Sequence, residues 1–310
     1  MARDHHDRPV RDEQQALRRI HELCDPSVGD DAAVVRAGSD GLCISTDATV
    51  QGVHAPLAMP ARALGRRAAA RAISDLAAMG ALPRAMTCSV LVPPDGWTDA
   101  VDAVAGVAER GREQGMPLVG GDLCRTPGPL GLVVTVVGRR GAPRASAFIT
   151  RAGAHVGDLV VVTGQLGAAS SGHGDHAGDR AALLPEPPDR LRAGAALARH
   201  VSAMTDISDG IARDAANLAE ASGVGIEIAI RELPLAPGID DPVAAATYGD
   251  DYELLATVAP ERHDALRSSL RDADPTLGLT VVGRCVDGDP VARFLCDGSQ
   301  VELPPGFLHR

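Results

Sequence analysis

The sequence predicts an α/β protein built from two domains. Short apolar runs typical of buried strands alternate with stretches whose apolar residues recur at helical spacing. The 310 residues are enough for two domains of ordinary size, each with its own core. Glycines, arginines and a proline separate two patterned regions at 138–143. We therefore expect an N-terminal domain over residues 13–140 and a C-terminal domain over residues 141–310.

The N-terminal half is predicted to contain a mixed sheet and three helices. Residues 1–12 are charged and are expected to be disordered. Helices are expected at 13–23, 60–79 and 99–114, and Gly80 is expected to end the second of them. Strands are expected at 32–35, 42–44, 86–92, 117–119 and 130–137. A turn at 38–41 would join the first two strands as a hairpin.

The C-terminal half shows the same alternation of strands and helices. Strands are expected at 159–163, 203–207, 225–230, 254–258, 280–286 and 292–295. Helices are expected at 189–199, 211–221 and 261–270. Residues 164–179 are rich in Gly, Ser and His and are predicted to form a mobile loop.

Charge and composition exclude several classes of function. A net charge of −11 argues against a nucleic-acid partner, because the phosphate backbone requires a basic surface. The chain contains no lysine, so it has neither a Walker A lysine nor a Schiff-base lysine. A phosphate-handling enzyme of this composition must neutralise charge with metal ions, arginines and backbone N–H groups.

The cysteine pattern and the N-terminus indicate a compartment. The six cysteines show no C-x-x-C spacing, and several lie inside apolar runs, which is typical of buried thiols in a reducing environment. The N-terminus lacks an apolar leader, and no apolar segment is long enough to span a bilayer. We expect a soluble, cytoplasmic protein that does not interact with membranes.

Aspartates recur beside Gly, Ser or Thr, several of them directly behind apolar runs. Asp47 would lie at the C-terminal end of the strand 42–44, where α/β sheets place ligand sites. Any single site of this kind is most simply a turn residue or a helix N-cap. If the sites converge, however, their repulsion requires cations, and oxygen-only ligands favour Mg²⁺. The motifs are Gly29-Asp30-Asp31, Ser45-Thr46-Asp47, Ser74-Asp75, Gly120-Gly121-Asp122, Asp206-Ile207-Ser208-Asp209-Gly210 and Gly249-Asp250-Asp251.

These motifs, in this order, resemble the thiamine-monophosphate kinase family from about residue 13 to the end of the chain. The resemblance also includes Gly52-Val53-His54, the continuation Leu76–Ala81 after Ser74-Asp75, Thr150-Arg151-Ala152-Gly153-Ala154, and the Tyr252-Glu253-Leu254 that follows Asp251. It implies the two-domain fold of a wider group that includes aminoimidazole ribonucleotide synthetase and selenophosphate synthetase. Such proteins dimerise through an N-terminal mixed sheet and bind ATP with metals in a long cleft. The resemblance therefore implies a homodimer that uses Mg²⁺ and ATP.

The resemblance assigns roles to residues at matching positions. It implies direct in-line transfer of the ATP γ-phosphoryl group to thiamine monophosphate, with Asp47, Asp75, Asp209 and Arg151 as catalytic residues. Implied metal ligands are Asp30, Ser45, Thr46, Asp47, Asp75, Asp122, Asp206 and Asp209. Implied ATP contacts are Gly121, Asp122, Arg151 and Ser208. Implied contacts of thiamine monophosphate are His54, Asp250 and Phe307.

Departures from the family pattern gather near the acceptor site. The family usually has Glu at the position of Asp250, and Ala55, Ala72, Leu123 and Arg310 also differ from its usual residues. Two alternatives therefore stay open beside the kinase. One is an ATP-dependent phosphotransferase acting on another small acceptor, and the other is a catalytically silent nucleotide-binding dimer.

Overall fold

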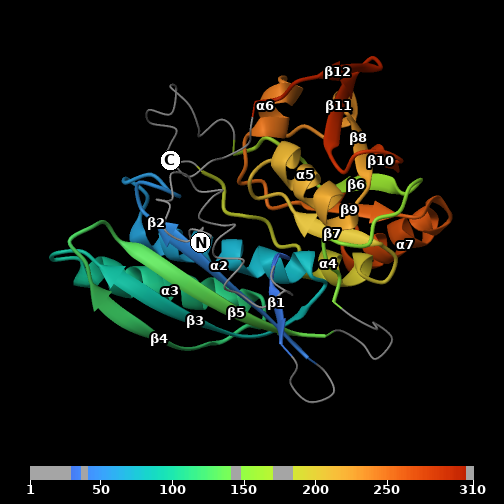
Figure 1. The fold of residues 1–310 in the computed structure, drawn as a ribbon. Coiled ribbons are helices and arrows are strands. Elements are labelled where there is room, and N and C mark those ends of the chain that lie inside the picture. The colour runs from blue at the N-terminus through green and yellow to red at the C-terminus, as the bar shows by residue number, and fades with distance from the viewer. Residues whose placement is uncertain (1–28, 36–40, 141–147, 170–183, 305–310) are drawn as a thin grey trace, which may run out of the picture.

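The protein contains two β-sheets that lie in two lobes (Figure 1). The computed structural model describes residues 29–35, 41–140, 148–169 and 184–304. The first sheet has the order β1-β2-β5-β3-β4, and the second has the order β12-β11-β8-β10-β6-β9-β7. The predicted α/β fold class is confirmed. The predicted disorder at 1–12, the predicted helix at 13–23 and most of the predicted loop at 164–179 lie outside the described residues.

The first sheet is mixed, as the sequence predicts. Its strands are β1 (Ala33–Val35), β2 (Leu42–Val50), β3 (Leu82–Val92), β4 (Leu118–Arg125) and β5 (Gly131–Arg139). All pairs are antiparallel except β3 with β4. Helices α2 (Ala61–Ala78) and α3 (Trp97–Glu113) belong to this lobe and pack on one another. Because side chains alternate along a strand, Cys43 and Thr49 of β2 are buried, whereas Thr46 and Ala48 are exposed on the other face.

The second sheet is mainly antiparallel, with β8 and β11 as a parallel pair. Its strands are β6 (Leu159–Thr163), β7 (Ala203–Asp206), β8 (Gly225–Ala229), β9 (Leu254–Val258), β10 (Leu279–Val286), β11 (Ala292–Cys296) and β12 (Ser299–Val301). Its helices are α4 (Leu191–Leu197), α5 (Ile211–Ser222), α6 (Pro242–Thr247) and α7 (His263–Ala273), with short 3-10 turns at Ile230–Glu232 and Pro260–Arg262. The predicted strands 159–163 and 254–258 are confirmed to the residue. The short elements α6 and β12 were not predicted.

Strands β2 and β4 continue six residues past their predicted ends, and this changes the setting of two motifs. Strand β2 continues to Val50 because it pairs with β5 over nine residues, so Asp47 lies inside the strand and the prediction that it follows the strand is wrong. Strand β4 likewise continues through Gly121 and Asp122 because it pairs with β3. Backbone pairing thus extends both strands through polar residues that end an apolar run.

Helix α2 connects the two lobes. It contacts β2 and β5 on one side and α4 and β7 on the other. One continuous core accordingly contains Leu64 and Leu76 of α2 together with Met204 of β7. A second core lies within the C-terminal lobe. Helix α2 is rich in alanine but also contains four arginines. In the described part of the chain, no helix is long and apolar enough to cross a membrane.

Two glycines set how closely α2 and α3 pack. A Cβ atom built on Gly65 would lie 1.8 Å from the carbonyl oxygen of Ala103, and one built on Gly106 would lie 2.1 Å from the carbonyl oxygen of Arg62. We expect Gly65→Ala to lower the free energy of unfolding by about 2–3 kcal/mol, because the helices must separate. Chemical denaturation measures this change. The matched control is Gly115→Ala, where nothing lies within 4 Å of the new Cβ, although a positive φ of 66° adds local strain. A smaller loss for Gly65→Ala than for Gly115→Ala would contradict the prediction.

Candidate functional site

Three carboxylates converge where the two lobes meet. Asp31 precedes β1, Asp75 lies in the penultimate turn of α2, and Asp206 is the last residue of β7. Each offers an oxygen within 4.8 Å of the others. The predicted ligands Asp75 and Asp206 are therefore brought together. Their third partner is Asp31, which was not among the predicted site residues, whereas its predicted neighbour Asp30 is not part of this group.

Burial makes it unfavourable for the three carboxylates of this cluster to be charged at the same time. The pKa of Asp206 is raised to about 7, chiefly by desolvation and next by the charge of Asp31. Burial and the nearby Asp206 and Asp31 also raise the pKa of Asp75 well above its usual range. Two hydroxyls partly offset these effects: Ser45 Oγ donates to Asp75 Oδ2, and Ser74 Oγ donates to Asp206 Oδ2 at 2.6 Å. The three carboxylates therefore need a cation to be ionised together at neutral pH.

The donor set fits a hard divalent cation. All of the converging atoms are oxygens, with no histidine or cysteine among them, which is the ligand chemistry that Mg²⁺ prefers. Oδ2 of Asp31 is buried and has no hydrogen-bond partner among the described residues. A buried carboxylate oxygen without a partner is unfavourable unless a ligand satisfies it. The cluster Asp31–Asp75–Asp206 therefore has the composition and the unsatisfied oxygen of a metal site.

Arg151 connects this cluster to the residues around Asp30. Its Nη2 lies 2.6 Å from Asp31 Oδ1, and its Nε donates to Thr205 Oγ1 at 3.3 Å. Its backbone N–H donates to Asp30 Oδ1 at 2.7 Å. Asp30 thus positions the backbone of Arg151, while Asp31 binds its guanidinium group. The adjacent Asp30 and Asp31 have different roles, which spacing alone could not distinguish.

A second charged group lies beside the first. Arg71 Nε of α2 lies 3.1 Å from Asp47 Oδ2, and Arg67 Nη2 lies 2.7 Å from Asp250 Oδ2. Burial raises the pKa of Asp47, which Arg71 partly offsets, and the charge of Asp250 raises it further. Arg67 is only 1% exposed. Asp47, a predicted metal ligand, and Asp250, a predicted contact of the phosphoryl acceptor, therefore lie near one another. Each is paired with an arginine of α2.

The turn between β7 and α5 contributes a third group of predicted residues. Asp209 forms an ion pair with Arg213 at 3.4 Å, and its backbone N–H donates to Asp214 Oδ2 at 3.1 Å. Burial, followed by the charges of Asp209 and Asp206, raises the pKa of Asp214 well above its usual range. The carbonyl oxygen of Ser208 accepts from the backbone N–H of Asp250 at 2.9 Å. This turn thus places Ser208 and Asp209 between Asp206 and Asp250.

Several predicted residues lie outside these groups. Thr46 points to the exposed face of the first sheet, where its Oγ1 lies 2.9 Å from Thr135 Oγ1. Gly121 and Asp122 lie on the edge strand β4, three strands from β2, which corresponds to about 14 Å. His54 lies in the turn after β2, and its Nδ1 accepts from the backbone N–H of Val50 at 3.1 Å. Phe307 and Arg310 lie outside the described residues.

A cavity of about 740 Å³ adjoins the second charged group. Asp250, Asp251 and Glu253 line it together with Arg190. Glu253 is held by both Arg190 Nε and Arg190 Nη2 at 2.6 Å. Burial raises the pKa of Asp251 to about 8, and its Oδ1 accepts from the backbone N–H of Gly167 at 2.9 Å. The lining is strongly acidic, which suits a cationic ligand.

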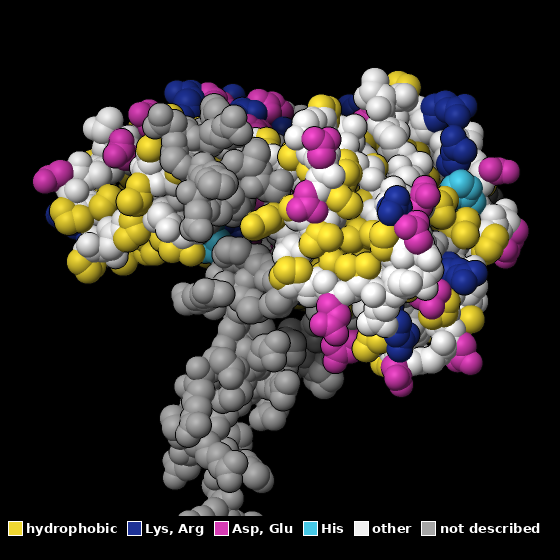
Figure 2. Space-filling model, turned by 90° about the horizontal axis from the view of Figure 1, so that it is seen from above, with side chains coloured by type: hydrophobic (Ala, Val, Ile, Leu, Met, Phe, Trp, Pro, Cys, Tyr) yellow, Lys and Arg dark blue, Asp and Glu magenta, His cyan; other side chains and the backbone are white. Residues whose placement is uncertain are grey.

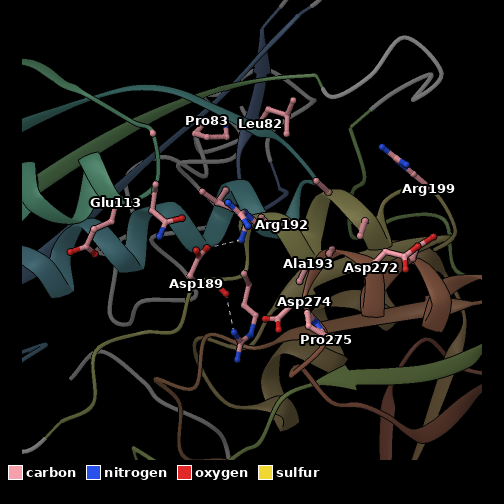
Figure 3. A pocket seen from close by; sticks show the side chains of 18 residues that line it. Leu82, Pro83, Glu113, Asp189, Arg192, Ala193, Arg199, Asp272, Asp274 and Pro275 are labelled. Carbon is pink, nitrogen blue, oxygen red and sulfur yellow. Dashed lines mark hydrogen bonds between the residues drawn. The ribbon is translucent and has the colours of Figure 1, made fainter.

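A larger cavity of about 1170 Å³ lies elsewhere, between α3, α4 and the end of α7 (Figure 3). Its labelled lining residues include Glu113, Asp189, Arg192 and Asp274. None of the predicted site residues that the structure describes lines it. Size alone therefore does not locate the site.

Sequence reasoning assigned no role to several polar neighbours of the predicted residues. Asp31, Ser74 and Thr205 each lie next to a predicted residue, so the doubled or adjacent polar residue was the available signal. Arg67 and Arg71 follow the spacing i, i+4 and continue to Asp75 at i+8, which places all three on one face of α2. The sequence shows that spacing, but it does not show that this face of α2 packs against the second lobe.

Comparisons with known proteins agree with this geometry. The AIR synthase related protein family matches with its N-terminal domain over residues 29–140 and its C-terminal domain over residues 155–295. A thiamine-monophosphate kinase of Halobacterium salinarum is 33% identical over 91% of this chain and 98% of its own length. One from Caulobacter vibrioides is 32% identical over 90% of this chain and 84% of its own length.

Solved structures give the same result. A structure described as AaThiL complexed with AMPPCP and TMP superposes with a TM-score of 0.82 at 28% identity, covering 97% of this chain and 99% of that one. Thiamine-monophosphate kinase from Stenotrophomonas maltophilia gives a TM-score of 0.73 at 30% identity, covering 93% and 96%. With two domain models matched in order and full-length relatives above 30% identity, the chain belongs to the AIR synthase related family and, within it, to the thiamine-monophosphate kinases.

Proposed function

We propose that this protein transfers the γ-phosphoryl group of ATP to the phosphate of thiamine monophosphate, producing thiamine diphosphate and ADP. The observation that supports it most is the buried cluster Asp31–Asp75–Asp206 beside Arg151, in a chain whose relatives are thiamine-monophosphate kinases. The acceptor is already a phosphate oxygen, so the reaction needs charge neutralisation and alignment more than a general base. A cluster of anionic ligands with one arginine meets that need.

Mg²⁺ would be held by Asp31, Asp75 and Asp206, with the hydroxyl of Ser45 beside Asp75. When bound, Mg²⁺ supplies screening between the two anionic substrates and stabilises charge in the transition state. Arg151 offers a guanidinium group that can bind phosphate oxygens in two places. Of the other predicted ligands, Asp30 and Asp209 complete the proposed ligand set. Asp47 instead faces Arg71, and Thr46 and Asp122 lie on the outer face of the first sheet. Ser208, in the turn before α5, is the proposed phosphate contact.

The position of Asp122 favours a homodimer. Thr46 and the side chain of Asp122 belong to the outer face of the first sheet, which carries Ile44, Val133 and Val137 and is not covered by α2 and α3. Figure 2 shows hydrophobic side chains gathered along one side of the lobe that carries this sheet. A second copy packed on this face would cover those side chains. It would also bring Gly121 and Asp122 of the partner subunit towards the ATP site.

The acceptor is proposed to bind at Asp250, with His54 and Phe307 as further contacts. Asp250 is close enough to Asp47 to raise its pKa and also lines the acidic cavity of about 740 Å³. Thiamine monophosphate has a positively charged ring, so an acidic cavity beside the phosphate-handling residues suits it. Of the described departures from the family pattern, Asp250 lines this cavity, whereas Ala55 lies in the turn after β2, Ala72 is buried in α2 and Leu123 lies on the edge strand β4.

Replacing Asp250 with Asn is expected to raise the KM for thiamine monophosphate about tenfold and to leave the KM for ATP within about twofold. Asn has the same shape and tolerates the positive φ of 73° at this position, so the change removes mainly the charge. Steady-state kinetics with each substrate varied in turn measures both constants. The matched control is Asp297→Asn, at an exposed aspartate with a φ of 50°. A change in the KM for ATP alone would place Asp250 away from the acceptor.

The direct test of the function is turnover of thiamine monophosphate with ATP and Mg²⁺, following ADP and thiamine diphosphate together. Equal amounts of both products are expected. ADP without thiamine diphosphate would instead favour a phosphotransferase with another acceptor. Binding of ATP without any turnover would favour a silent nucleotide-binding dimer.

A further inference from the structure

We propose that the positively charged guanidinium group of Arg71 takes the place of one divalent metal ion at Asp47. On this proposal Asp47 is bound by Arg71 and not by metal, and the protein recruits its metal to the Asp31–Asp75–Asp206 cluster. The inference rests on the metal-dependent function proposed above. It concerns how many metal ions this particular chain binds.

The contact between Arg71 and Asp47 uses two atoms of each group. Nη2 of Arg71 donates to Asp47 Oδ1 at 3.5 Å, and Nε lies 3.1 Å from Asp47 Oδ2, an ion-pair distance without hydrogen-bond geometry. The side chain of Arg71 is 13% exposed, so solvent screens the pair only weakly. A guanidinium group that faces both oxygens of one carboxylate occupies the side from which a cation would bind. A metal ion that approaches Asp47 from this side would have to displace it.

The groups around Arg71 come from three elements. Asp75 lies one helical turn further along α2, Asp47 lies on β2, and Asp250 and Tyr252 precede β9. The charges of Asp47, Asp250 and Asp75 all stabilise the charged guanidinium group of Arg71. Tyr252 is buried, and desolvation raises its pKa well above its usual range. Arg71 thus lies among carboxylates from both lobes, in the kind of position that a bridging cation takes.

Formal charges divide the site into two parts. In the first, Asp47 and Asp250 face Arg71 and Arg67, so the carboxylates are matched by arginines. In the second, Asp31, Asp75 and Asp206 face Arg151, and an excess of negative charge remains. Within the described part of the chain, Oδ2 of Asp31 also has no hydrogen-bond partner. A divalent cation is therefore attracted to the second part, while the first is already neutral.

Direct counting of Mn²⁺ tests this inference. We expect Arg71→Met, which keeps an unbranched apolar side chain but removes the guanidinium group, to bind one more Mn²⁺ per chain than the unchanged protein, in the presence of a non-hydrolysable ATP analogue. The gain in Tm from Mg²⁺ should also be larger in Arg71→Met, by about 3 °C or more, because metal now neutralises Asp47. Electron paramagnetic resonance and thermal unfolding measure the two quantities. An equal Mn²⁺ count in both proteins would overturn the proposal.

Matched variants separate this role from a merely structural ion pair. Arg66→Met removes an arginine of the same helix that pairs with Glu113 and Glu186, and it should change neither the Mn²⁺ count nor the Tm gain. Arg71→Lys keeps the charge and should restore the lower count. If Arg71→Met does not fold, Asp47→Asn decides: its Mn²⁺ count should equal that of the unchanged protein, and loss of one Mn²⁺ would overturn the proposal. Turnover of thiamine monophosphate by the unchanged protein tests the proposed function separately.

Discussion

Replacing Asp75 with Asn is expected to lower kcat by about 1,000-fold and, at the same time, to raise the Tm of the metal-free protein. Asp75 offers an oxygen to the same point as Asp31 and Asp206, so its loss removes a ligand from the middle of the proposed metal site. Metal-assisted charge stabilisation is worth several kcal/mol in the transition state, which corresponds to this loss in rate.

The stability effect has the opposite sign. Burial and two neighbouring carboxylates raise the pKa of Asp75 well above its usual range, which means that its charge destabilises the folded state without metal. A neutral amide removes that repulsion and can still accept from Ser45 Oγ through its carbonyl oxygen. The same substitution therefore separates the requirements of stability from those of catalysis.

Steady-state turnover with Mg²⁺ and thermal unfolding in EDTA measure the two effects of Asp75→Asn. Asp102→Asn, at an exposed position of α3, serves as the control and should leave both quantities unchanged. Full activity in Asp75→Asn would remove Asp75 from the metal site. A lower Tm in EDTA would show instead that its carboxylate stabilises the fold.

The metal-free protein is expected to lose stability as the pH rises from about 5.5 to 8. The pKa of Asp206 is raised to about 7 and that of Asp251 to about 8, while both carboxyls titrate near 3.8 in the unfolded chain. In this window the folded state binds more protons than the unfolded state, so the free energy of unfolding falls as the pH rises. The expected fall is on the order of 4 kcal/mol.

Chemical denaturation in EDTA at several pH values between 5.5 and 8 measures this fall. Saturating Mg²⁺ should remove the part that belongs to Asp206, because the metal favours its charged form. Asp251→Asn should remove the other part, since Asp251 lies in the acidic cavity and not in the metal cluster. A metal-free protein that becomes more stable towards pH 8 would contradict the raised pKa values.

Local sequence pattern predicted most elements, because their stability depends on which residues each element buries. Strand β9 shows this: its five residues are all buried and apolar apart from Thr257, and its bounds follow directly from the run. Strand β2 shows the opposite case. Its second half is polar, and only pairing with β5, which is distant in sequence, makes it a strand. The local sequence pattern around β2 contains no information on its pairing with β5.

For the candidate site, too, the sequence predicted one part and the tertiary structure decided the other. The recurring aspartates predicted an oxygen-only cation site, and the structure brings Asp75 and Asp206 into one cluster. The sequence by itself thus determined the family, the sheet-and-helix order and the chemistry of the donors. Only the tertiary structure decided that Asp31 and not Asp30 joins the cluster, that Asp122 lies three strands away and that Arg71 binds Asp47. The reason is that each of these depends on side-chain direction and on contacts between distant segments, which the order of residues does not specify.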